Sequence, residues 1–501
     1  MTENLFILDR DSTESLQLQI RRQFVSAILG GSLPSGAAVP SSRKLATQLG
    51  VSRITVTQAY QALLDDGFLS SKERSRIFVS DRLTLPLGEQ PSKVKSTELE
   101  TISATLRIKH TPSHQQNIEK PENWRDYPFP FVTAQVDKSL FPIAAWRECS
   151  RQAMSLNAMA DWTEDRLGTD DPFLVEQIRT RLLPTRGIHA SEDEILVTAG
   201  AQNSLYMLAR LFLNNNTLFG VENPGYPDLR NIIQMIGSRI RYLELDQHGL
   251  IPDQQLDGCN IITITPSHQF PTTVTMPLDR RKAVLEKAEQ NNMVIIEDDY
   301  EPELNFKSSP TPAIKSLDQA GRVIYIGSLS KSFFPGLRLG YMVGPAHIIR
   351  EARALGRLMH RHTPTNNQRT MALFLALGHH DVLRKRLRKI YKNRWTEMET
   401  ALTRTGLSFQ NANGGSSFWV KGPDQLDSKE LLQHALNLGV VLEPGSIYYF
   451  DAFPKKQYFR LGYTAIEKNH ISEGIDKIRE ALDYSLERAN GAQVGANSSK
   501  Y

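Results

Sequence analysis

Apolar residues recur with helical spacing through the first 80 residues. The stretch Leu16–Leu29 places Ile20, Phe24, Ala27 and Ile28 on one face, and Ser41–Leu49 does the same with Leu45, Ala46 and Leu49. After Gly50, a third stretch starts at Ser52 and carries Val56, Ala59, Tyr60 and Leu63 at i, i+3, i+4 and i+7. Serines at the starts and glycine at the turn favour helix, tight turn and helix, followed by a short strand at Ile77–Val79.

A different pattern begins near residue 126, where short runs rich in β-branched residues alternate with amphipathic helical stretches. The predicted strands are Glu194–Thr198, Thr217–Val221, Arg239–Leu245, Asn260–Thr265, Met293–Glu297 and Arg322–Gly327. This alternation predicts a large α/β domain with a mostly parallel sheet covered by helices, completed by a smaller C-terminal α+β subdomain. Ligands of such sheets bind beyond the carboxyl ends of the strands, so the polar residues that follow each strand are the first candidates for a site.

Periodicity is lost between these two regions. Residues 81–125 are polar and interrupted by proline, which predicts a linker with room for a short helix around residues 95–108. The domain boundaries are therefore expected at 1–80, 81–125 and 126–490, with 491–501 as a disordered tail.

Composition narrows the class of protein. The chain has 501 residues, a formal net charge of +4 and two cysteines, Cys149 and Cys259, which favours two or three domains without a disulfide framework. No apolar run is long enough to span a membrane, and the acidic N-terminus does not resemble a signal peptide, so a cytoplasmic protein without a membrane partner is expected. The histidines show no metal-ligand spacing, and no metal site is predicted.

The third N-terminal helix has an outward face suited to DNA. Arg53, Thr55 and Gln58 lie opposite its apolar stripe and can reach base edges or phosphates. A small three-helix packing domain with a charged surface fits the same spacing, and the pattern alone does not separate the two.

A resemblance to a known family favours the DNA-binding domain over the packing domain. Leu33-Pro34-Ser35-Gly36, Val39–Ala46 and Leu49–Val56 resemble the GntR-type winged helix domain over about 65 residues. The resemblance implies that Arg43, Ser52, Arg53 and Thr55 contact double-stranded operator DNA, with a wing after Leu69. In place of the family's glycine-containing wing tip this chain has Arg74-Ser75-Arg76, where Arg74 and Arg76 are candidates for contacts to phosphates or the minor groove.

The parts of a pyridoxal 5′-phosphate (PLP) site follow the predicted strands of the second region. Such a site needs a lysine for the Schiff base and a carboxylate that keeps the pyridine nitrogen protonated. Asp298 and Tyr300 follow one strand and are expected to point the same way, with Tyr300 opposite the phenolic oxygen. The next strand leads to the Schiff-base candidate Lys331. Three further candidates for the cofactor lie close to it in the sequence: Ser328, Ser330 and, as a phosphate partner, Arg338.

A phosphate cradle and a stacking ring complete the set. Gly200, Ala201 and Gln202 follow another strand and open a helix, which is a typical anion site. Tyr226, after Asn223-Pro224-Gly225, is the candidate stacking ring. Each residue taken singly has an ordinary structural explanation, such as a solvated lysine or a loop-capping aspartate, so the inference depends on their joint occurrence.

The joint pattern resembles fold type I aminotransferases and, more closely, the MocR/GabR regulators. The motifs that carry this resemblance are Thr265–Thr272, Ile296–Tyr300, Tyr325–Lys331, Phe333–Tyr341 and Phe459–Tyr463. It implies that Arg460 binds the acidic group of an effector. It also implies a domain-swapped homodimer, in which the DNA-binding domain of one chain leans on the effector domain of the other.

Two positions depart from the family. Thr273 stands where the family often has glycine, and Asp228 stands where the γ-aminobutyrate-responsive members have arginine. The second difference argues against a second carboxylate clamp, so the effector is expected to differ from γ-aminobutyrate.

Three functions remain open at this point: the two that follow, and a carrier or sensor of PLP itself. The first is a transcription regulator that senses an amine or amino acid by forming an external aldimine in place of the Lys331 Schiff base. The second is an active aminotransferase with an accessory DNA-binding domain. The run Arg384–Lys389 is expected to be the solvated face of a long helix beginning near Asp381, with a path for DNA as the alternative.

Overall fold

The structure is a computed structural model. It describes residues 6–12, 14–72, 76–81, 110–156, 159, 163, 168–307, 311–329, 334–410, 412–450 and 454–498, the last of these with side chains to Glu487. Arg74, Ser330, Lys331 and the possible helix at 95–108 lie outside these residues. The chain divides into two compact units, Met1–Lys109 and His110–Tyr501. Residues 110–125, expected to belong to the linker, therefore pack with the second unit.

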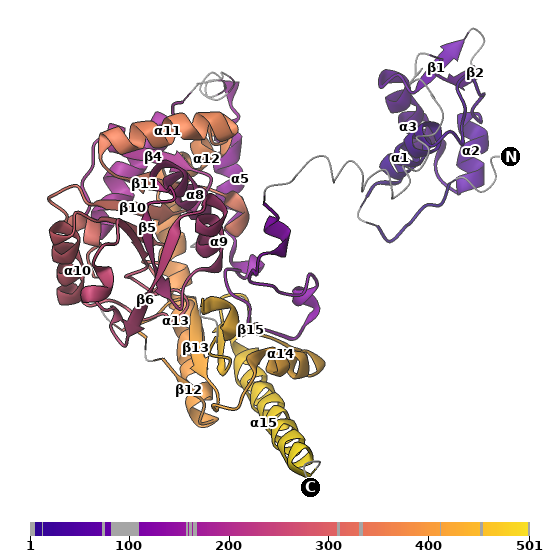
Figure 1. The fold of residues 1–501 in the computed structure, drawn as a ribbon. Helices are drawn as coiled ribbons and strands as arrows, with labels where there is room; N and C mark the ends of the chain where they lie inside the picture. Colours follow the sequence, from indigo (N-terminus) through magenta and orange to yellow (C-terminus); the bar gives the residue numbers. More distant parts are fainter. Residues whose placement is uncertain are drawn as a thin grey trace. The chain divides into compact units, whose positions relative to one another are not determined.

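The first unit is a three-helix domain with a β-hairpin (Figure 1). Its helices are α1 (Leu16–Leu29), α2 (Ser42–Leu49) and α3 (Arg53–Asp65), and β1 (Leu69–Lys72) pairs antiparallel with β2 (Arg76–Val79). The side chains of Ser41 and Ser52 accept hydrogen bonds from Lys44 N and Thr55 N and so cap α2 and α3. Gly50 makes the turn between them with φ 63°, a left-handed conformation that glycine adopts without strain. The predicted helix-turn-helix is confirmed.

The core of this unit is made by the apolar stripes that the sequence pattern indicates. Ile20 and Phe24 of α1, Leu45 of α2, and Val56 and Leu63 of α3 are fully buried in one cluster. Because these residues fix the rotation of α3, its other face is left outside the core.

The second unit contains, in its described part, an eight-stranded sheet of order β4-β11-β10-β9-β8-β5-β6-β7 (Figure 1). Five neighbouring strands are parallel: β10 (Val323–Ser328), β9 (Val294–Asp299), β8 (Ile261–Ile264), β5 (Leu218–Asn223) and β6 (Arg239–Asp246). β11 (Gly340–Val343) runs antiparallel between β10 and β4 (Ile195–Thr198), and β7 (Gly249–Leu250) is antiparallel at the other edge. The mostly parallel sheet is confirmed.

Helices cover both faces of this sheet, because alternate strand residues point to opposite sides. Ile296 and Ile324 pack with α8 (Ala201–Phe212), α9 (Pro227–Ile236) and α11 (Ala346–His360). Ile295 and Val323 pack on the other side with α10 (Leu278–Gln290).

A smaller subdomain follows in the chain. It contains a sheet of order β12-β13-β16-β15, formed by Ser408–Phe409, Ser417–Lys421, Tyr458–Gly462 and Glu443–Pro444. β14 (Val440–Val441) pairs with β3 (Phe129–Pro130), so the start of the second unit is anchored to its end. The helices of this part are α5 (Ile143–Ala153), α7 (Pro172–Gln177), α12 (Thr365–Ala376), α13 (His379–Arg404), α14 (Ser428–Asn437) and α15 (Lys468–Ser498).

Two long helices bear on expectations from the sequence. α13 begins at His379 and carries Arg384–Lys389, close to the expected start near Asp381. α15, drawn in yellow in Figure 1, continues through 491–498, part of the segment expected to be a disordered tail. No helix among the described residues combines the length and apolar character needed to cross a bilayer.

Candidate functional site

The N-terminus of α8 forms the anion-binding part of the site. Gly200 precedes α8 with φ 95° and provides no side-chain cap, so the first amides of the helix, at Ala201 and Gln202, lack the intrahelical acceptors of later turns. Arg338 lies directly against this turn, where its Nη2 donates to Ala199 O at 3.1 Å. A Cβ at position 200 would lie 3.1 Å from that guanidinium nitrogen. Glycine fits this position because it adopts the positive φ without strain and leaves room for Arg338 beside the helix amides, where both can face one anion.

Arg338 has a left-handed backbone conformation, with φ 51°. Such a conformation is costly for a residue with a Cβ, and strain of this kind is often retained where it aims a functional side chain. The residues present fit a phosphate group at this position: a helix N-terminus, a glycine turn and an arginine.

The predicted stacking residue lies beside this cradle. Tyr226 directly precedes α9, and its hydroxyl oxygen lies 2.8 Å from Gln202 Oε1. The Tyr226 ring meets Phe270 edge to face, with centroids 5.3 Å apart. Burial, then the nearby Asp228 carboxylate, raises the pKa of Tyr226 well above its ordinary value, so it remains a neutral phenol. The structure thus brings Gly200, Gln202, Tyr226 and Arg338 together.

Asp298 and Tyr300 lie at the end of β9 as the alternation of strand residues predicts. Asp298 is half-buried and pairs in register with Ile326 of β10, whereas Tyr300 is buried and its ring lies 5.9 Å from that of Phe270. The Asp298 charge acts on Tyr226, Tyr300 and Glu222, raising the pKa of each after the larger effect of burial. One carboxylate therefore lies close to both tyrosines of the candidate site.

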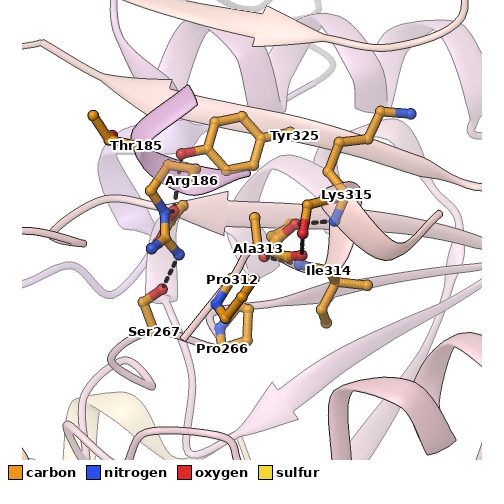
Figure 2. A network of polar contacts seen from close by, with 12 residues as sticks. Thr185, Arg186, Pro266, Ser267, Pro312, Ala313, Ile314, Lys315 and Tyr325 are labelled. Carbon is orange, nitrogen blue, oxygen red and sulfur yellow. Dashed lines mark hydrogen bonds and ion pairs between the residues drawn. The ribbon is translucent and has the colours of Figure 1, made fainter. Parts of the chain in front are cut away.

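Asp299, between them, points to the other side and holds the strand in place. Arg186 Nε donates to Asp299 Oδ2 at 2.7 Å, and the Tyr325 hydroxyl donates to the same oxygen at 2.8 Å. Figure 2 shows Arg186 between Ser267 and Tyr325, and its Nη2 donates to Ser267 Oγ at 3.0 Å. Burial alone would raise the pKa of Asp299, but the Arg186 ion pair and these hydrogen bonds hold it below its ordinary value.

The same network continues around Glu297. Its two carboxylate oxygens accept from the amides of Ile314 and Lys315, both at 2.8 Å, beside Pro312 and Ala313 in Figure 2. Burial, followed by the charge of Asp299, raises the pKa of Glu297. A fully buried carboxyl group needs such partners, and these two hydrogen bonds fix the carboxyl end of β9. Because Glu297 and Asp299 hold the end of β9 in place, Asp298 has a fixed position on the opposite face of the strand.

Glu222 is a buried acid at this site that sequence reasoning missed. It is the penultimate residue of β5. Its Oε2 accepts from Thr265 Oγ1 at 2.6 Å and from Gln269 Nε2 at 3.3 Å, while Oε1 has no hydrogen-bond partner among the described residues. Burial raises its pKa from 4.5 to about 7, and Asp298 adds to this. A carboxylate as the penultimate residue of a buried strand, just before Asn223-Pro224, was the available signal.

The raised pKa of Glu222 predicts a pH-dependent stability. Between pH 4.5 and about 7 the folded protein holds a proton that the unfolded chain has lost, so this contribution to stability falls as pH rises and is gone above about pH 7. Relative to Glu222→Gln, the wild type should lose about 3 kcal/mol across this window. Thermal unfolding midpoints of both proteins, measured from pH 5 to pH 8, check this. Parallel pH profiles would contradict it.

Arg460, the predicted effector residue, is buried under an aromatic cluster formed by Phe270, Tyr300, Trp419, Tyr448 and Tyr449. Its guanidinium carbon lies 4.3 Å from the centroid of Phe270. Arg460 Nε donates to Ser417 Oγ at 2.9 Å, and Nη1 lies 3.4 Å from Thr133 Oγ1 and 3.9 Å from Glu443 Oε2. Burial opposes the charge on Arg460, but Tyr448 and Glu443 raise its pKa, so it remains protonated.

Glu443 and Thr133 were also missed. Thr133 is far in the sequence from both other residues, and Glu443 meets Arg460 only through the pairing of β15 with β16. The Glu443 carboxylate accepts from Thr133 N at 3.1 Å, from Thr133 Oγ1 at 2.7 Å and from the Tyr448 hydroxyl at 2.8 Å. Arg460 is thus held on one side, through Nε and Nη1, by groups of this chain. A fork of guanidinium donors so oriented can bind an acid group on its remaining side.

Ser328 ends β10 opposite Gly340 of β11. It lines a cavity of ≈ 680 Å³ whose walls also include Asp299, Arg186 and Arg384. Its predicted neighbours Ser330 and Lys331 lie outside the described residues.

The predicted DNA-binding residues of the first unit share one property, which is solvent access. Arg43, Ser52, Arg53, Gln58 and Arg76 are exposed, and Thr55 is half-buried. Ser52 Oγ accepts from Thr55 N at 3.1 Å and lies 2.8 Å from its Oγ1, so these two side chains form the cap of α3. Arg74 lies outside the described residues.

Comparisons with known proteins match both units. The family model "Bacterial regulatory proteins, gntR family" matches residues 16–79, and "Aminotransferase class I and II" matches residues 141–478. The HTH-type transcriptional regulator TauR of Rhodobacter capsulatus is 39% identical over 483 residues, covering 95% of this chain and 98% of TauR. The probable rhizopine catabolism regulatory protein MocR of Rhizobium meliloti is 28% identical, covering 98% and 100%.

The chain belongs to the MocR-type transcriptional regulators. The second domain of this MocR-type regulator has the fold of the PLP-dependent aminotransferases. A solved kynurenine aminotransferase from Pyrococcus horikoshii, in complex with PMP, is 27% identical with a TM-score of 0.69, covering 77% of this chain and 99% of that one. The LysN α-aminoadipate aminotransferase of Thermus thermophilus, at 23% identity and a TM-score of 0.68, has the same fold.

One departure of this MocR-type regulator from its family has a structural consequence. Thr273, where glycine is frequent, has φ 64°, and its amide donates to Gln269 O at 2.6 Å. A β-branched residue is strained in that region of backbone conformation, which explains why glycine suits the position. Here the turn is retained with threonine.

Proposed function

We propose that this regulator binds PLP through Lys331 and senses an amine or amino-acid effector at Arg460. PLP supplies an aldehyde carbon that primary amines bind covalently and reversibly. The observation that carries the proposal is the packing of Arg338 on Gly200 at the start of α8, with Arg460 close by behind the ring of Phe270.

Different residues of the chain bind different parts of the cofactor and of the effector. Arg338 and the amides at Ala201 and Gln202 bind the phosphate, and Tyr226 stacks on the ring. Asp298 retains a proton on the pyridine nitrogen, and Tyr300 faces the phenolic oxygen, with Ser328 and Ser330 as further hydroxyls near the cofactor. Arg460 orients the effector by its acid group. An effector that contacts Arg460 differently in two arrangements of the protein shifts the balance between them, and DNA affinity shifts with it.

The direct test measures operator affinity of the full-length protein at physiological salt. Three preparations are compared: without PLP, with PLP, and with PLP plus each member of a panel of amines and amino acids. At least one amine should change operator affinity by about 5- to 150-fold, the usual range of coupling between two sites. No response to any amine, in a protein that binds both DNA and PLP, would refute the sensing role.

We further propose that the exposed residues of α2, α3 and the wing read the operator, namely Arg43, Ser52, Arg53, Thr55, Gln58, Arg74 and Arg76. Arg53→Ala should weaken operator binding by about 1–3 kcal/mol while PLP binding stays intact. Arg22→Ala, an exposed arginine on α1, serves as the matched control. Unchanged operator affinity of Arg53→Ala in gel-shift titrations would mean that α3 is not the recognition helix.

A homodimer, domain-swapped as in the family resemblance, is also proposed, together with a cytoplasmic location. Large apolar side chains remain exposed on the second unit, such as Leu156 at 86% and Leu358 at 77%, and a second copy of the chain would cover such residues. Analytical ultracentrifugation at micromolar concentration tests this part.

An active aminotransferase is the second candidate. It is favoured by the likeness to the Pyrococcus horikoshii enzyme and by a 29% identity to the aromatic-amino-acid aminotransferase 1 of Thermococcus litoralis over 67% of this chain. Steady turnover of an amino donor and a keto acid at about 1 s⁻¹ or faster would support it, because that is the ordinary range of enzymes.

A further inference from the structure

A short segment near the start of the second unit is bound to α9 by hydrogen bonds. This segment, Gln115–Ile118, is called the strap here. Gln115 Nε2 donates to Asn231 O at 3.2 Å, and Gln116 O accepts from Asn231 Nδ2 at 3.0 Å and from Arg230 Nη2 at 3.3 Å. The strap is therefore bound to the helix that begins just after Tyr226.

Asp228 joins the strap to the cofactor site. The Tyr226 hydroxyl donates to Asp228 Oδ2 at 3.0 Å. The side-chain amide of Asn117 lies 2.7 Å from Asp228 Oδ1. With its oxygen at this position it would accept from Asn231 Nδ2 at 2.9 Å but face the carboxylate oxygen, so we assign the nitrogen to this position, where it donates to Asp228. Each oxygen of one carboxylate thus binds one partner, the stacking tyrosine on one side and the strap on the other.

The end of the strap also reaches the effector side of the pocket. Ile118 packs against the aromatic cluster that covers Arg460, the one containing Phe270 and Tyr448. The strap lines a cavity of ≈ 290 Å³ together with Glu443, the counter-ion of Arg460, and with Pro444 and Ile447.

We propose that the strap closes the effector pocket and that Asp228 is the positioning residue that latches it to Tyr226. This inference rests on the proposed function, because it assigns a mode of regulation to the same site. A ligand that moves Tyr226 or the aromatic cluster changes the contacts of Asn117 and Ile118. The linker that follows the DNA-binding unit in the sequence leads to the strap. When the strap is released from α9, the linker therefore loses this attachment to the second unit.

The residue type at position 228 agrees with this role. A latch that holds a tyrosine hydroxyl and an amide at once needs two acceptors, and a carboxylate supplies them. A residue with only donors, such as arginine or lysine, could accept neither bond. Asp228 thus acts on the strap and Tyr226, and the acid group of an effector is left to Arg460.

The test uses the full-length protein loaded with PLP. Asn117→Asp sets two carboxylates against each other and should open the strap. The double variant Asn117→Asp/Asp228→Asn reverses donor and acceptor and should close the strap again, since the new amide at position 228 can donate to the new carboxylate at position 117 and still accept from Tyr226. The control is Asn123→Asp, which makes the same charge change on an exposed residue outside the strap. This residue is not part of the contact between Asn117 and Asp228.

The readout is the rate of cleavage after Glu119 by a glutamate-specific protease, followed by mass spectrometry. Cleavage requires local unfolding of the strap, so its rate reports how often the strap is open. We expect Asn117→Asp to accelerate cleavage about five- to tenfold, as loss of one charge-assisted hydrogen bond implies. The double variant and Asn123→Asp should return to within about twofold of the wild type.

The outcomes separate this inference from the function on which it rests. Equal cleavage of Asn117→Asp and wild type, or no rescue in the double variant, overturns the latch. Visible absorbance of bound PLP and the amine response of operator binding are measured on the same preparations. If the wild type shows neither the PLP absorbance nor the amine response, while the cleavage rates of the variants differ as expected, the proposed function is overturned. The strap would then be a structural contact only.

Discussion

Lys331→Ala should lose the visible absorbance of lysine-bound PLP completely and lose every response of DNA binding to amines. Lysine is the residue type that forms the covalent link to PLP, and position 331 follows β10, which lies next to Asp298 of β9. Operator affinity itself should stay within about twofold, because the winged helix has a core of its own. Absorbance spectra after desalting, then gel-shift titrations with and without amine, measure both effects.

A matched control is needed because PLP also reacts with surface lysines. Lys389→Ala removes an exposed lysine from α13 and should retain the absorbance and the response. Borohydride reduction followed by peptide mapping should place the label on Lys331 in the wild type. An amine response that survives in Lys331→Ala would show that sensing does not require the covalent link.

Arg460→Met should lower the unfolding free energy of the second domain by about 3–5 kcal/mol, because it leaves Glu443 buried without its counter-ion. The variant should also lose its response to effectors that carry an acid group. Without Arg460, the neighbouring hydroxyls of Thr133 and Tyr448 cannot bind that group, because both already donate to the Glu443 carboxylate. Denaturant unfolding and operator titrations measure the two losses separately.

A double variant distinguishes the buried charge from lost packing. Arg460→Met/Glu443→Gln removes both charges and should recover most of the lost stability without recovering the response. Ser417→Ala removes only the hydrogen bond to Arg460 Nε and should cost about 1 kcal/mol. An Arg460→Met protein as stable as the wild type would mean that the Arg460–Glu443 pair contributes little to the fold.

The variants Lys331→Ala and Arg460→Met together separate the regulator from the aminotransferase. A regulator needs Lys331 and Arg460 for its response to amines but needs no turnover. An aminotransferase needs both for turnover, whatever happens at the operator. Steady-state rates measured beside operator affinities therefore decide between the two functions.

The elements that the sequence predicted well are those governed by local rules. α1, α2 and α3 follow from a 3.6-residue apolar period, serine caps at Ser41 and Ser52, and a glycine turn at Gly50. The strands of the parallel sheet follow from short β-branched runs at regular intervals. Such signals involve residues within a few positions of each other, so one sequence contains them in full.

Antiparallel β11 was not predicted, and neither was the small four-stranded sheet. β11 has only four residues, Gly340–Val343, and its place is decided by pairing with β4 and β10 on either side, as at Gly340↔Thr198 and Val343↔Tyr325. Pairing with a strand as distant in the sequence as β4 has no local sequence signal. β3 and β14, joined across the whole second domain, are a further case.

The sequence by itself determined the chemical parts of this protein: the caps and apolar stripes of a helix-turn-helix, and a lysine, an aspartate, tyrosines and arginines that follow strands in the order of a PLP site. These parts are readable because each lies in a short motif. Only the tertiary structure decided how they are held. It placed Arg338 on Gly200, buried Glu222 beside Asp298, paired Arg460 with Glu443, and joined Asp228 to Tyr226 and Asn117. The physical reason is that burial and charge pairing depend on distances in space, which a linear sequence does not contain. Gly200 and Arg338, like Asn117 and Asp228, lie more than a hundred positions apart.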